Sequence, residues 1–320
     1  MRTETLGAVT RWSTRLVGRA STGLYGALRR SGVPAAKRYL SNQAVVLCFH
    51  NVVPDPLGGQ IGDGPLHLPA ARFRALIEWM SGAFHVVSLG ELVDRLEQDK
   101  PLRGLAALTF DDGYRGFCRH AVPVLREFQT PASVFIVGDG AEVPAPFWWD
   151  RLGRGSQLDP ADRLRCRDDL AGDARRIAAA YPLATGEELP DDCLPASWAE
   201  LAGLPEAVSV ESHTQSHPNL TRIDATQLQA ELTGSRERIA ARTGRAPAFI
   251  SYPFGLSSPG VAAAARAAGY RAGFSLSFRS AGSIAPGSDR HDLLRINVPA
   301  SLTVDALACW TAGFRRSPRS

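Results

Sequence analysis

Short apolar runs alternate with helical patterns from Ala44 onward, and this alternation predicts the fold class. The apolar runs are rich in β-branched and aromatic residues, as strands buried on both faces are. They predict strands at Ala44–Phe49, Ala106–Phe110, Ala132–Val137, Val208–Ser212, Phe249–Ser251, Ala272–Leu276 and Leu294–Val298. Apolar positions at helical spacing predict helices at Ala70–Met80, Leu89–Gln98, Val122–Phe128, Ala225–Thr243 and Val261–Ala268. This order favours a mainly parallel sheet with helices outside it.

The number of strands predicts an α/β fold, a distorted or incomplete (β/α) barrel of about seven strands. An open, doubly wound sheet is the competing architecture. Residues 139–205 depart from the rhythm, because they contain no strand pattern and show helical spacing around Asp162–Tyr181. We interpret them as a helical insertion in a catalytic domain that spans residues 41–320.

Residues 1–40 differ in composition from the rest of the chain. The chain has 320 residues, 44% apolar and 21% charged, which is typical of a globular protein with a large core. Its formal net charge is +4, and one segment carries much of the excess. The basic residues of that segment are Arg2, Arg11, Arg15, Arg19, Arg29, Arg30, Lys37 and Arg38, with Glu4 as the only acid. The remainder is close to neutral, which disfavours nucleic acid as a partner.

Two interpretations of residues 1–40 stay open. Leu6, Val9, Leu16 and Val17 interleave with the arginines, as in a helix that lies on an anionic membrane surface. A solvated N-terminal arm is the alternative. No export signal or membrane-spanning run of about 18 apolar residues is recognisable. We therefore expect a cytoplasmic protein, with peripheral contact at the inner membrane face if the first interpretation holds.

Two polar motifs follow predicted strands and carry the candidate chemistry. Asp111 and Asp112 end the run that begins near Ala106, and Gly113 breaks the strand directly after them. His213 and His217 follow the strand at Val208–Ser212, and Pro218 indicates a turn rather than a helix there. One Asp and two His make an open site for a divalent metal, and the second Asp is left free as a base. Barrel enzymes keep such groups at the carboxyl ends of their strands.

With these motifs the sequence resembles the polysaccharide deacetylase family, also called the NodB-homology domain or carbohydrate esterase family 4. The family's first motif, Thr-Phe-Asp-Asp-Gly, stands at Thr109–Gly113, and its second, His-Ser/Thr-x-x-His-Pro, at His213–Pro218. Ser251–Gly255 resembles the third motif, which forms a groove wall. The resemblance covers roughly residues 44–298 and is closest to bacterial exopolysaccharide and poly-N-acetylglucosamine deacetylases.

The resemblance implies a role for each motif residue. Asp111 is then the general base, and the metal ligands are Asp112, His213 and His217. The metal is usually Zn²⁺, but Co²⁺ or Ni²⁺ suit the same ligands. The backbone N–H of Phe254 is expected to stabilise the oxyanion. Substrate contacts are expected from Tyr114, Trp148, Tyr252 and Pro253.

Two features depart from the family pattern. Ser251 stands where the third motif often carries an Arg that orients the base, and the late histidine that usually serves as general acid is not recognisable. His50, at the end of the first strand, resembles an early histidine of the exopolysaccharide deacetylases and is the preferred acid. His291 remains the alternative, whereas His67, His85 and His120 are interpreted as structural.

These expectations predict a metal-dependent hydrolase that removes N-acetyl groups from an N-acetylated sugar in a glycan or a sugar–lipid conjugate. Asp111 is expected to activate a metal-bound water. One alternative is a deformylase or cyclic-imide hydrolase on the same fold. Another is a carbohydrate-binding relative without activity.

Overall fold

Seven parallel strands form a closed barrel. The computed structural model describes residues 23–57, 61–152, 159–181, 189–277 and 282–315. The barrel strands are, in order, β1 (Ala44–Phe49), β5 (Leu105–Phe110), β6 (Ala132–Ile136), β7 (Val208–Ser212), β8 (Phe249–Ser251), β9 (Ala272–Leu276) and β11 (Leu293–Asn297). Strand β1 pairs with both β5 and β11, which closes the ring. The predicted barrel is therefore confirmed, and the open doubly wound sheet is excluded.

The barrel strands are buried on both faces, which explains their continuous apolar runs. Every residue of β1, β5 and β6 is buried. One face of each strand fills the barrel, and the other packs against helices. Two short strands, β4 (His85–Val86) and β10 (Ser283–Ile284), pair with the beginnings of β5 and β1. Each has two residues, too few for a recognisable pattern in the sequence.

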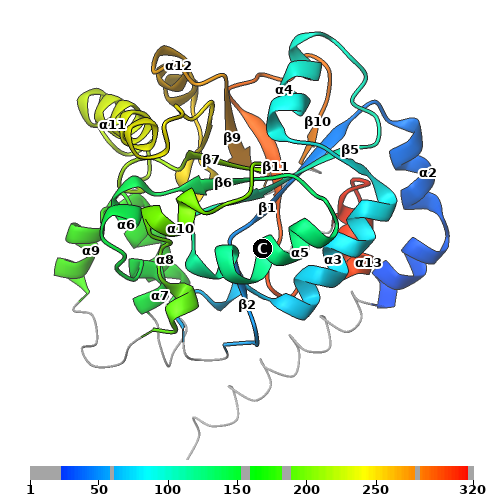
Figure 1. Ribbon diagram of the computed structural model, residues 1–320, viewed down its shortest axis with the longest axis horizontal. Helices are drawn as coiled ribbons and strands as arrows, with labels where there is room; N and C mark the ends of the chain where they lie inside the picture. Colours follow the sequence, from blue (N-terminus) through cyan, green and yellow to red (C-terminus); the bar gives the residue numbers. More distant parts are fainter. Residues whose placement is uncertain (1–22, 58–60, 153–158, 182–188, 278–281, 316–320) are drawn as a thin grey trace, which may run out of the picture.

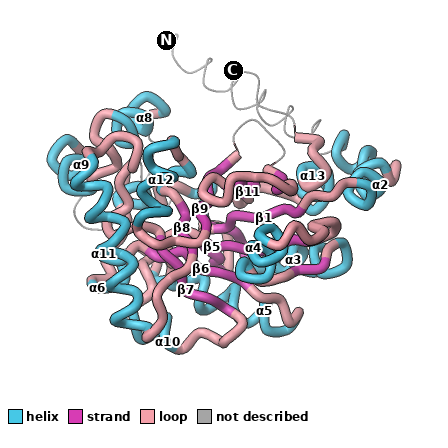
Figure 2. Tube along the Cα trace, turned by 90° about the horizontal axis from the view of Figure 1, so that it is seen from above, coloured by secondary structure: helices cyan, strands magenta, loops and turns pink. Residues whose placement is uncertain are grey.

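Helices surround the barrel, as the view from above shows (Figure 2). They are α3 (Ala70–Ala83), α4 (Leu89–Glu97), α5 (Val122–Glu127), α11 (Ala225–Thr243), α12 (Pro259–Ala267) and α13 (Val304–Trp310). Helix α11 has the predicted bounds because Asp224 accepts a hydrogen bond from the Gln227 N–H, and Gly244 ends it in the left-handed conformation. A π-helical turn, η3 (Phe117–Ala121), leads into α5.

The insertion between β6 and β7 is helical, and the described part of it contains no named strand. Its elements are α6 (Gly138–Glu142), α7 (Trp148–Arg151), α8 (Pro160–Asp168), α9 (Ala174–Ala180), the 3₁₀ turn η4 (Asp191–Cys193) and α10 (Trp198–Ala202). The single helical pattern expected at 162–181 is two helices, because Ala171 and Gly172 both take left-handed conformations between them. In Figure 1 these elements gather on one side of the barrel.

A buried asparagine joins the insertion to the loop after β7. The Asn219 side chain donates to the Arg167 carbonyl at 3.1 Å, and its backbone N–H donates to the Ala171 carbonyl at 2.7 Å. Both acceptors belong to the insertion. The insertion is therefore held against the segment that carries His213 and His217.

The first described residues pack on the far side of the barrel from the insertion (Figure 1). Residues 23–30 are helical, and α2 (Val33–Leu40) follows them. Arg38 donates to the Ala308 carbonyl of α13 at 2.8 Å, and Arg29 pairs with Asp305. None of the helices in the described ranges is both long and apolar enough to cross a bilayer. Residues 1–22 lie outside the described residues, so neither interpretation of that part, an interfacial helix or a solvated arm, is tested.

A small parallel sheet flanks the carboxyl end of β1. It joins β2 (Asn51–Val53) to β3 (His67–Pro69), and the turn η2 (Gly64–Leu66) precedes β3. His67 is buried in this sheet and belongs to a network described below.

Candidate active site

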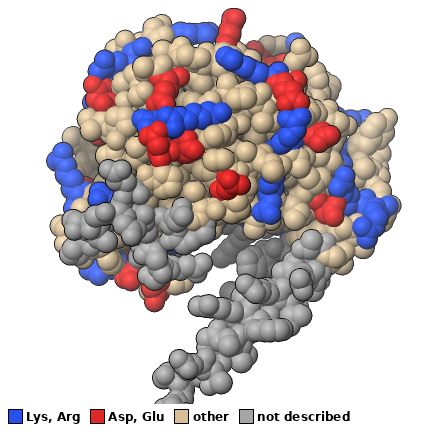
Figure 3. Space-filling model, turned by 60° about the horizontal axis from the view of Figure 1, so that its bottom comes forward, with Lys and Arg blue, Asp and Glu red and all other residues tan. Residues whose placement is uncertain are grey.

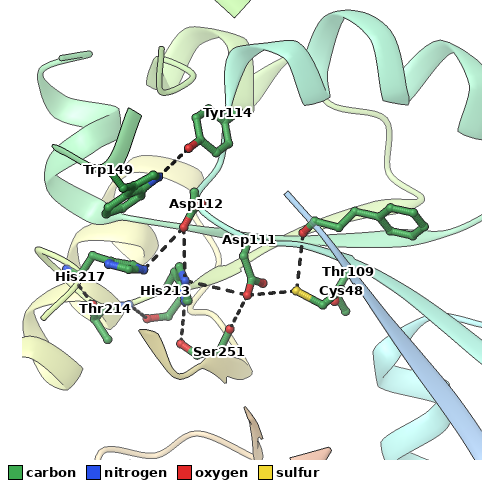
Figure 4. Close-up of polar contacts among 12 residues, drawn as sticks. Cys48, Thr109, Asp111, Asp112, Tyr114, Trp149, His213, Thr214, His217 and Ser251 are labelled. Carbon is green, nitrogen blue, oxygen red and sulfur yellow. Dashed lines mark hydrogen bonds and ion pairs between the residues drawn. The ribbon is translucent and has the colours of Figure 1, made fainter. Parts of the chain in front are cut away.

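Asp111 and Asp112 leave the end of β5 toward the same site (Figure 4). In a regular strand neighbouring side chains face opposite sides. Here Asp112 has φ 71° and Gly113 φ 75°, so the alternation ends at once. A Cβ at residue 113 would lie 2.8 Å from a methyl carbon of Ile136, so only glycine fits. The Asp-Asp-Gly sequence thus serves a backbone turn that aims both carboxylates at one place.

Asp112, His213 and His217 bring three donor atoms together. The Asp112 Oδ1 lies 3.5 Å from His213 Nε2 and 3.6 Å from His217 Nε2. All three residues are buried. Ligand atoms held about 2 Å from a tetrahedral ion lie roughly 3.4 Å apart, so this set fits a divalent metal such as zinc. The two histidines lie on a turn, as predicted.

Different contacts orient the two imidazoles. His213 Nδ1 donates to the Ser251 carbonyl at 2.8 Å, so Nε2 keeps its lone pair facing Asp112. His217 Nδ1 has no hydrogen-bond partner among the residues that the structure describes. Its ring lies instead between Trp149 and Phe254, with centroid distances of 4.6 and 4.8 Å. Burial and the nearby His213 lower the pKa of His217 to about 3, which keeps it neutral and able to bind a metal.

Strained backbone is concentrated in the same region. Among the described residues, seven other than glycine have positive φ, and four of these belong to the site motifs. They are Asp112, Thr214, His217 and Phe254. Each such conformation costs on the order of 1 kcal/mol and persists only where the surroundings enforce it. The site geometry is therefore built into the fold.

Asp111 is held by a buried arginine from β11. Arg295 Nη1 and Nη2 each donate to one oxygen of Asp111 at 2.7 Å. The hydroxyl of Ser251 and the thiol of Cys48 also donate to Asp111 Oδ2, at 3.0 and 3.4 Å. Burial alone would raise the pKa of Asp111, but the guanidinium and the adjacent imidazoles outweigh it and keep the pKa below its usual range. The carboxylate is thus ionised and fixed in direction.

Arg295 is the site residue that sequence reasoning missed. It stands between Leu294 and Ile296 in β11, has no exposed surface, and also donates to Ser251 Oγ at 2.7 Å. Ser251 therefore takes the position expected for an arginine of the third motif, and the guanidinium comes from a strand later in the chain. The available signal was a lone arginine in a predicted core strand, together with a third motif that lacks one.

His50 and His291 lie in very different places. His50 follows β1, and its ring, the Cys48 thiol and the Asp111 carboxylate have donor atoms within 4.8 Å of one another. His291 precedes β11, at the opposite end of the barrel, where its Nε2 bonds to the Tyr270 carbonyl. Only His50 is brought to the site.

Phe254 lies beside the metal ligands in the 3₁₀ turn η5 (Pro253–Gly255). Its φ is 59°, and no acceptor among the described residues is recorded for its backbone N–H. The N–H is therefore available to an oxygen of a bound molecule.

The residues expected to touch substrate are mostly buried. Tyr114 and Tyr252 have no exposed surface, and their hydroxyls donate to Asp150 Oδ2 and to the His291 carbonyl. Pro253 is also buried, and Trp148 is 7% exposed. The structure thus leaves no surface on either tyrosine for a sugar, because both rings fill the space between packed elements. Their expected substrate contacts are not supported.

A buried polar network supports Trp149. His67 Nε2 bonds to Asp150 Oδ1 at 3.0 Å, and the Tyr114 hydroxyl donates to Asp150 Oδ2 at 2.6 Å. Trp149 Nε1 donates to the same hydroxyl at 2.8 Å (Figure 4). Burial raises the pKa of Asp150, although His67 and Tyr114 counteract it. The network fixes the indole that contacts His217.

A cavity of about 610 Å³ lies between the insertion and the start of α11. Phe147 and Trp148 line one side, and Pro218 and Ile223 line the other. His217 and Trp149 also line it, so it adjoins the metal ligands.

Comparisons with known proteins agree with this geometry. Residues 98–273 match the family described as polysaccharide deacetylase. The YxkH protein of Bacillus subtilis (strain 168) is 24% identical over 210 residues, which are 65% of this chain and 58% of that protein. The poly-beta-1,6-N-acetyl-D-glucosamine N-deacetylase of Escherichia coli (strain K12) is 26% identical over 134 residues, 41% of this chain. These residues are only 19% of that enzyme, so the chain spans less than two thirds of both relatives.

Solved structures share the fold. The Streptococcus pyogenes deacetylase PplD, solved in complex with acetate, has a TM-score of 0.59 at 16% identity. The match covers 83% of this chain and 96% of that one. IcaB from Ammonifex degensii has a TM-score of 0.57 at 17% identity, over 85% and 98% of the two chains.

Proposed function

The chain belongs to the polysaccharide deacetylase family, and from that premise we propose that it is a metal-dependent hydrolase that removes N-acetyl groups from an N-acetylated sugar. The substrate is a glycan or a sugar–lipid conjugate. The observation that carries the proposal is the junction of an Asp-His-His donor set with a second, arginine-held carboxylate. A metal site and a carboxylate base together are what metal-assisted hydrolysis of an amide at neutral pH requires.

Asp112, His213 and His217 would hold the metal, which we propose to be zinc. Co²⁺ and Ni²⁺ accept the same ligands, and metal analysis distinguishes them. A divalent ion bound there supplies positive charge that polarises the acetyl oxygen and lowers the pKa of water. His213 is prepared for this role by the Ser251 carbonyl, which fixes its tautomer.

The protein's own groups perform the proton transfers. Asp111 accepts a proton from the attacking water, because Arg295 keeps the carboxylate ionised and aims it. The Phe254 N–H stabilises the oxyanion of the tetrahedral intermediate. His50 protonates the departing amine, since it is the histidine that lies near Asp111 without belonging to the Asp-His-His set. Neighbouring sugar units occupy the cavity beside His217.

Hydrolysis of formamides or cyclic imides is the second candidate, since the same groups would serve it. The similarity to a poly-beta-1,6-N-acetyl-D-glucosamine N-deacetylase favours acetylated sugars. A purely carbohydrate-binding protein would have no need for the bidentate Arg295–Asp111 contact, which orients a base.

Mass spectrometry of N-acetylated oligosaccharides incubated with the zinc-loaded protein tests the proposal. We expect one acetyl group to be replaced by hydrogen, with acetate and no formate released. Asp112→Asn should reduce the rate by roughly 10³-fold or more and abolish stoichiometric metal binding. Asp99→Asn is the matched control, because Asp99 also has positive φ (51°) but lies far from the site. Full turnover in the Asp112 variant, or formate as the product, would overturn the assignment.

A further inference from the structure

The outward face of α2 is apolar, which is the reverse of an ordinary surface helix. Val33, Ala35, Ala36, Tyr39 and Leu40 are all exposed and lie on one side of this eight-residue helix. Tyr39 is 72% exposed and Leu40 74%. Water-soluble helices normally place their apolar side chains against the core.

Arg38, one of the two charged residues of α2, faces the protein instead. Arg38 donates to the Ala308 carbonyl and lies over the rings of Trp79 and Phe84. Lys37 lies 4.6 Å from the ring centroid of Phe314. Arg38 is therefore used in packing, whereas Lys37 is exposed and carries the one positive charge beside the apolar side chains of α2.

Exposed apolar side chains are concentrated in this part of the molecule. Six large apolar residues are exposed in the described ranges, and four of them are Leu24, Val33, Tyr39 and Leu40. Helix α2 lies at the outer edge of the molecule in two perpendicular views (Figures 1 and 2). Exposed apolar side chains gathered in one region in this way mark a contact with another protein or with a membrane.

The positive charge near α2 favours an anionic membrane as the partner of this face. Residues 1–40 contain eight Lys and Arg and one Glu. Two copies of such a segment repel one another, whereas an anionic bilayer attracts it. On the face seen in Figure 3, basic and acidic residues alternate and neither forms one extended patch. Positive charge and exposed apolar side chains thus coincide in the described residues 23–40, which contain four Lys and Arg and no acid.

We propose that the outward face of α2 docks on an anionic membrane surface. Val33, Tyr39 and Leu40 enter the interfacial layer, and the exposed Arg30 and Lys37 contact lipid headgroups. Tyrosine suits this depth because its ring is apolar and its hydroxyl is polar. The inference is independent of the hydrolytic chemistry. Docking of this kind would place the protein at the inner face of the cytoplasmic membrane.

Co-sedimentation of the full-length protein with vesicles tests the docking. The vesicles are phosphatidylcholine alone or phosphatidylcholine mixed with phosphatidylglycerol. We expect binding to the anionic vesicles, and a decrease of at least tenfold in the triple variant Val33→Ser, Tyr39→Ser, Leu40→Ser, which leaves every charge in place. The double variant Val143→Ser, Leu164→Ser removes exposed apolar groups from the insertion and should bind as the unmodified protein does.

Three outcomes would overturn the proposal. Equal vesicle binding by the triple variant would assign binding to charge alone. A dimer that the triple variant dissociates would assign the face to a second copy. A triple variant that melts at lower temperature with unchanged vesicle binding would assign the face to another segment of the chain. Deacetylation of a soluble oligosaccharide should be unaffected by the triple variant, so failure of docking is distinguishable from failure of the proposed activity.

Discussion

The two sides of the active site are built in different ways. On one side, strand ends supply Asp111, Ser251 and Arg295, which are joined by short hydrogen bonds between charged or hydroxyl groups. On the other side, the insertion supplies Trp149, which contacts His217 through its ring. We refer to these as the strand side and the insertion side.

The same difference separates the two histidines. His213 is oriented by the hydrogen bond that it donates to the Ser251 carbonyl on the strand side. His217 is oriented by aromatic packing, with Trp149 of the insertion side on one face and Phe254 of η5 on the other. A hydrogen bond fixes both the tautomer and the angle of a ring, whereas packing fixes only the angle. The strand side therefore determines the chemistry, and the insertion side adjusts it.

Removal of Arg295 should give the largest decrease in stability and in deacetylation among the changes considered. Arg295→Met leaves Asp111 as a buried anion without a counter-charge, which costs about 3–5 kcal/mol of stability. We expect deacetylation to decrease by roughly 10²-fold or more. Arg295→Lys keeps the charge but not the two parallel bonds, so it should recover stability more than activity. Thermal melting and kcat measure the two effects. Equal activity of the Lys variant and the original protein would show that aiming of Asp111 is unimportant.

Tyr114→Phe should give a smaller effect that is confined to the insertion side. The change removes one hydroxyl, so Trp149 Nε1 loses its acceptor and Asp150 loses a donor. We expect metal affinity to decrease by about tenfold, the range for groups that orient a ligand. Metal titration with a chelating buffer measures it. Tyr181→Phe is the control, because the Tyr181 hydroxyl bonds to Asp162 in α8, away from the metal ligands. Unchanged metal affinity in the Tyr114 variant would show that the insertion side does not orient His217 for metal binding.

Glu211→Gln should affect stability without affecting turnover. Glu211 on β7 accepts the N–H groups of Ala248 and Phe249, and burial raises its pKa to about 7 from 4.5. Its contribution to folding is therefore complete below pH 4.5 and is lost as the pH rises to about 7. Glutamine lacks this titration, so the variant should be more stable than the original protein at pH 7 by on the order of 1–3 kcal/mol. Unfolding by denaturant at several pH values, in metal-free protein, measures the difference. A constant difference across this range would contradict the assignment.

The strand side could be predicted from the sequence except for Arg295, whereas the contacts of the insertion side could not. Asp111, Asp112, His213 and His217 each follow a recognisable strand, and parallel strands of a barrel bring their carboxyl ends together. Trp149 reaches His217 only because Asn219 and the left-handed turn at Ala171–Gly172 dock the insertion on the β7 loop. No local pattern encodes that docking. His67 has the structural role that we expect from the sequence. No sequence pattern, however, indicates that it supports Trp149 through Asp150 and Tyr114.

Arg295 shows a second limit of prediction. Its side chain meets Asp111 across 184 positions of sequence, and strand pairing around the ring decides this contact. The family match at residues 98–273 includes neither His50 nor Arg295. The two groups proposed to supply the proton and aim the base therefore come from strands at the margins of the resemblance.

Closure of the barrel also sets an order of events during synthesis. Asp111 leaves the ribosome long before Arg295, and until β11 inserts between β1 and β9 the carboxylate has no guanidinium beside it. A nascent or truncated chain that ends before residue 295 can hold every recognised motif and still lack a working base. Hydrolysis by this protein is thus expected to begin only when the last strand, β11, is in place.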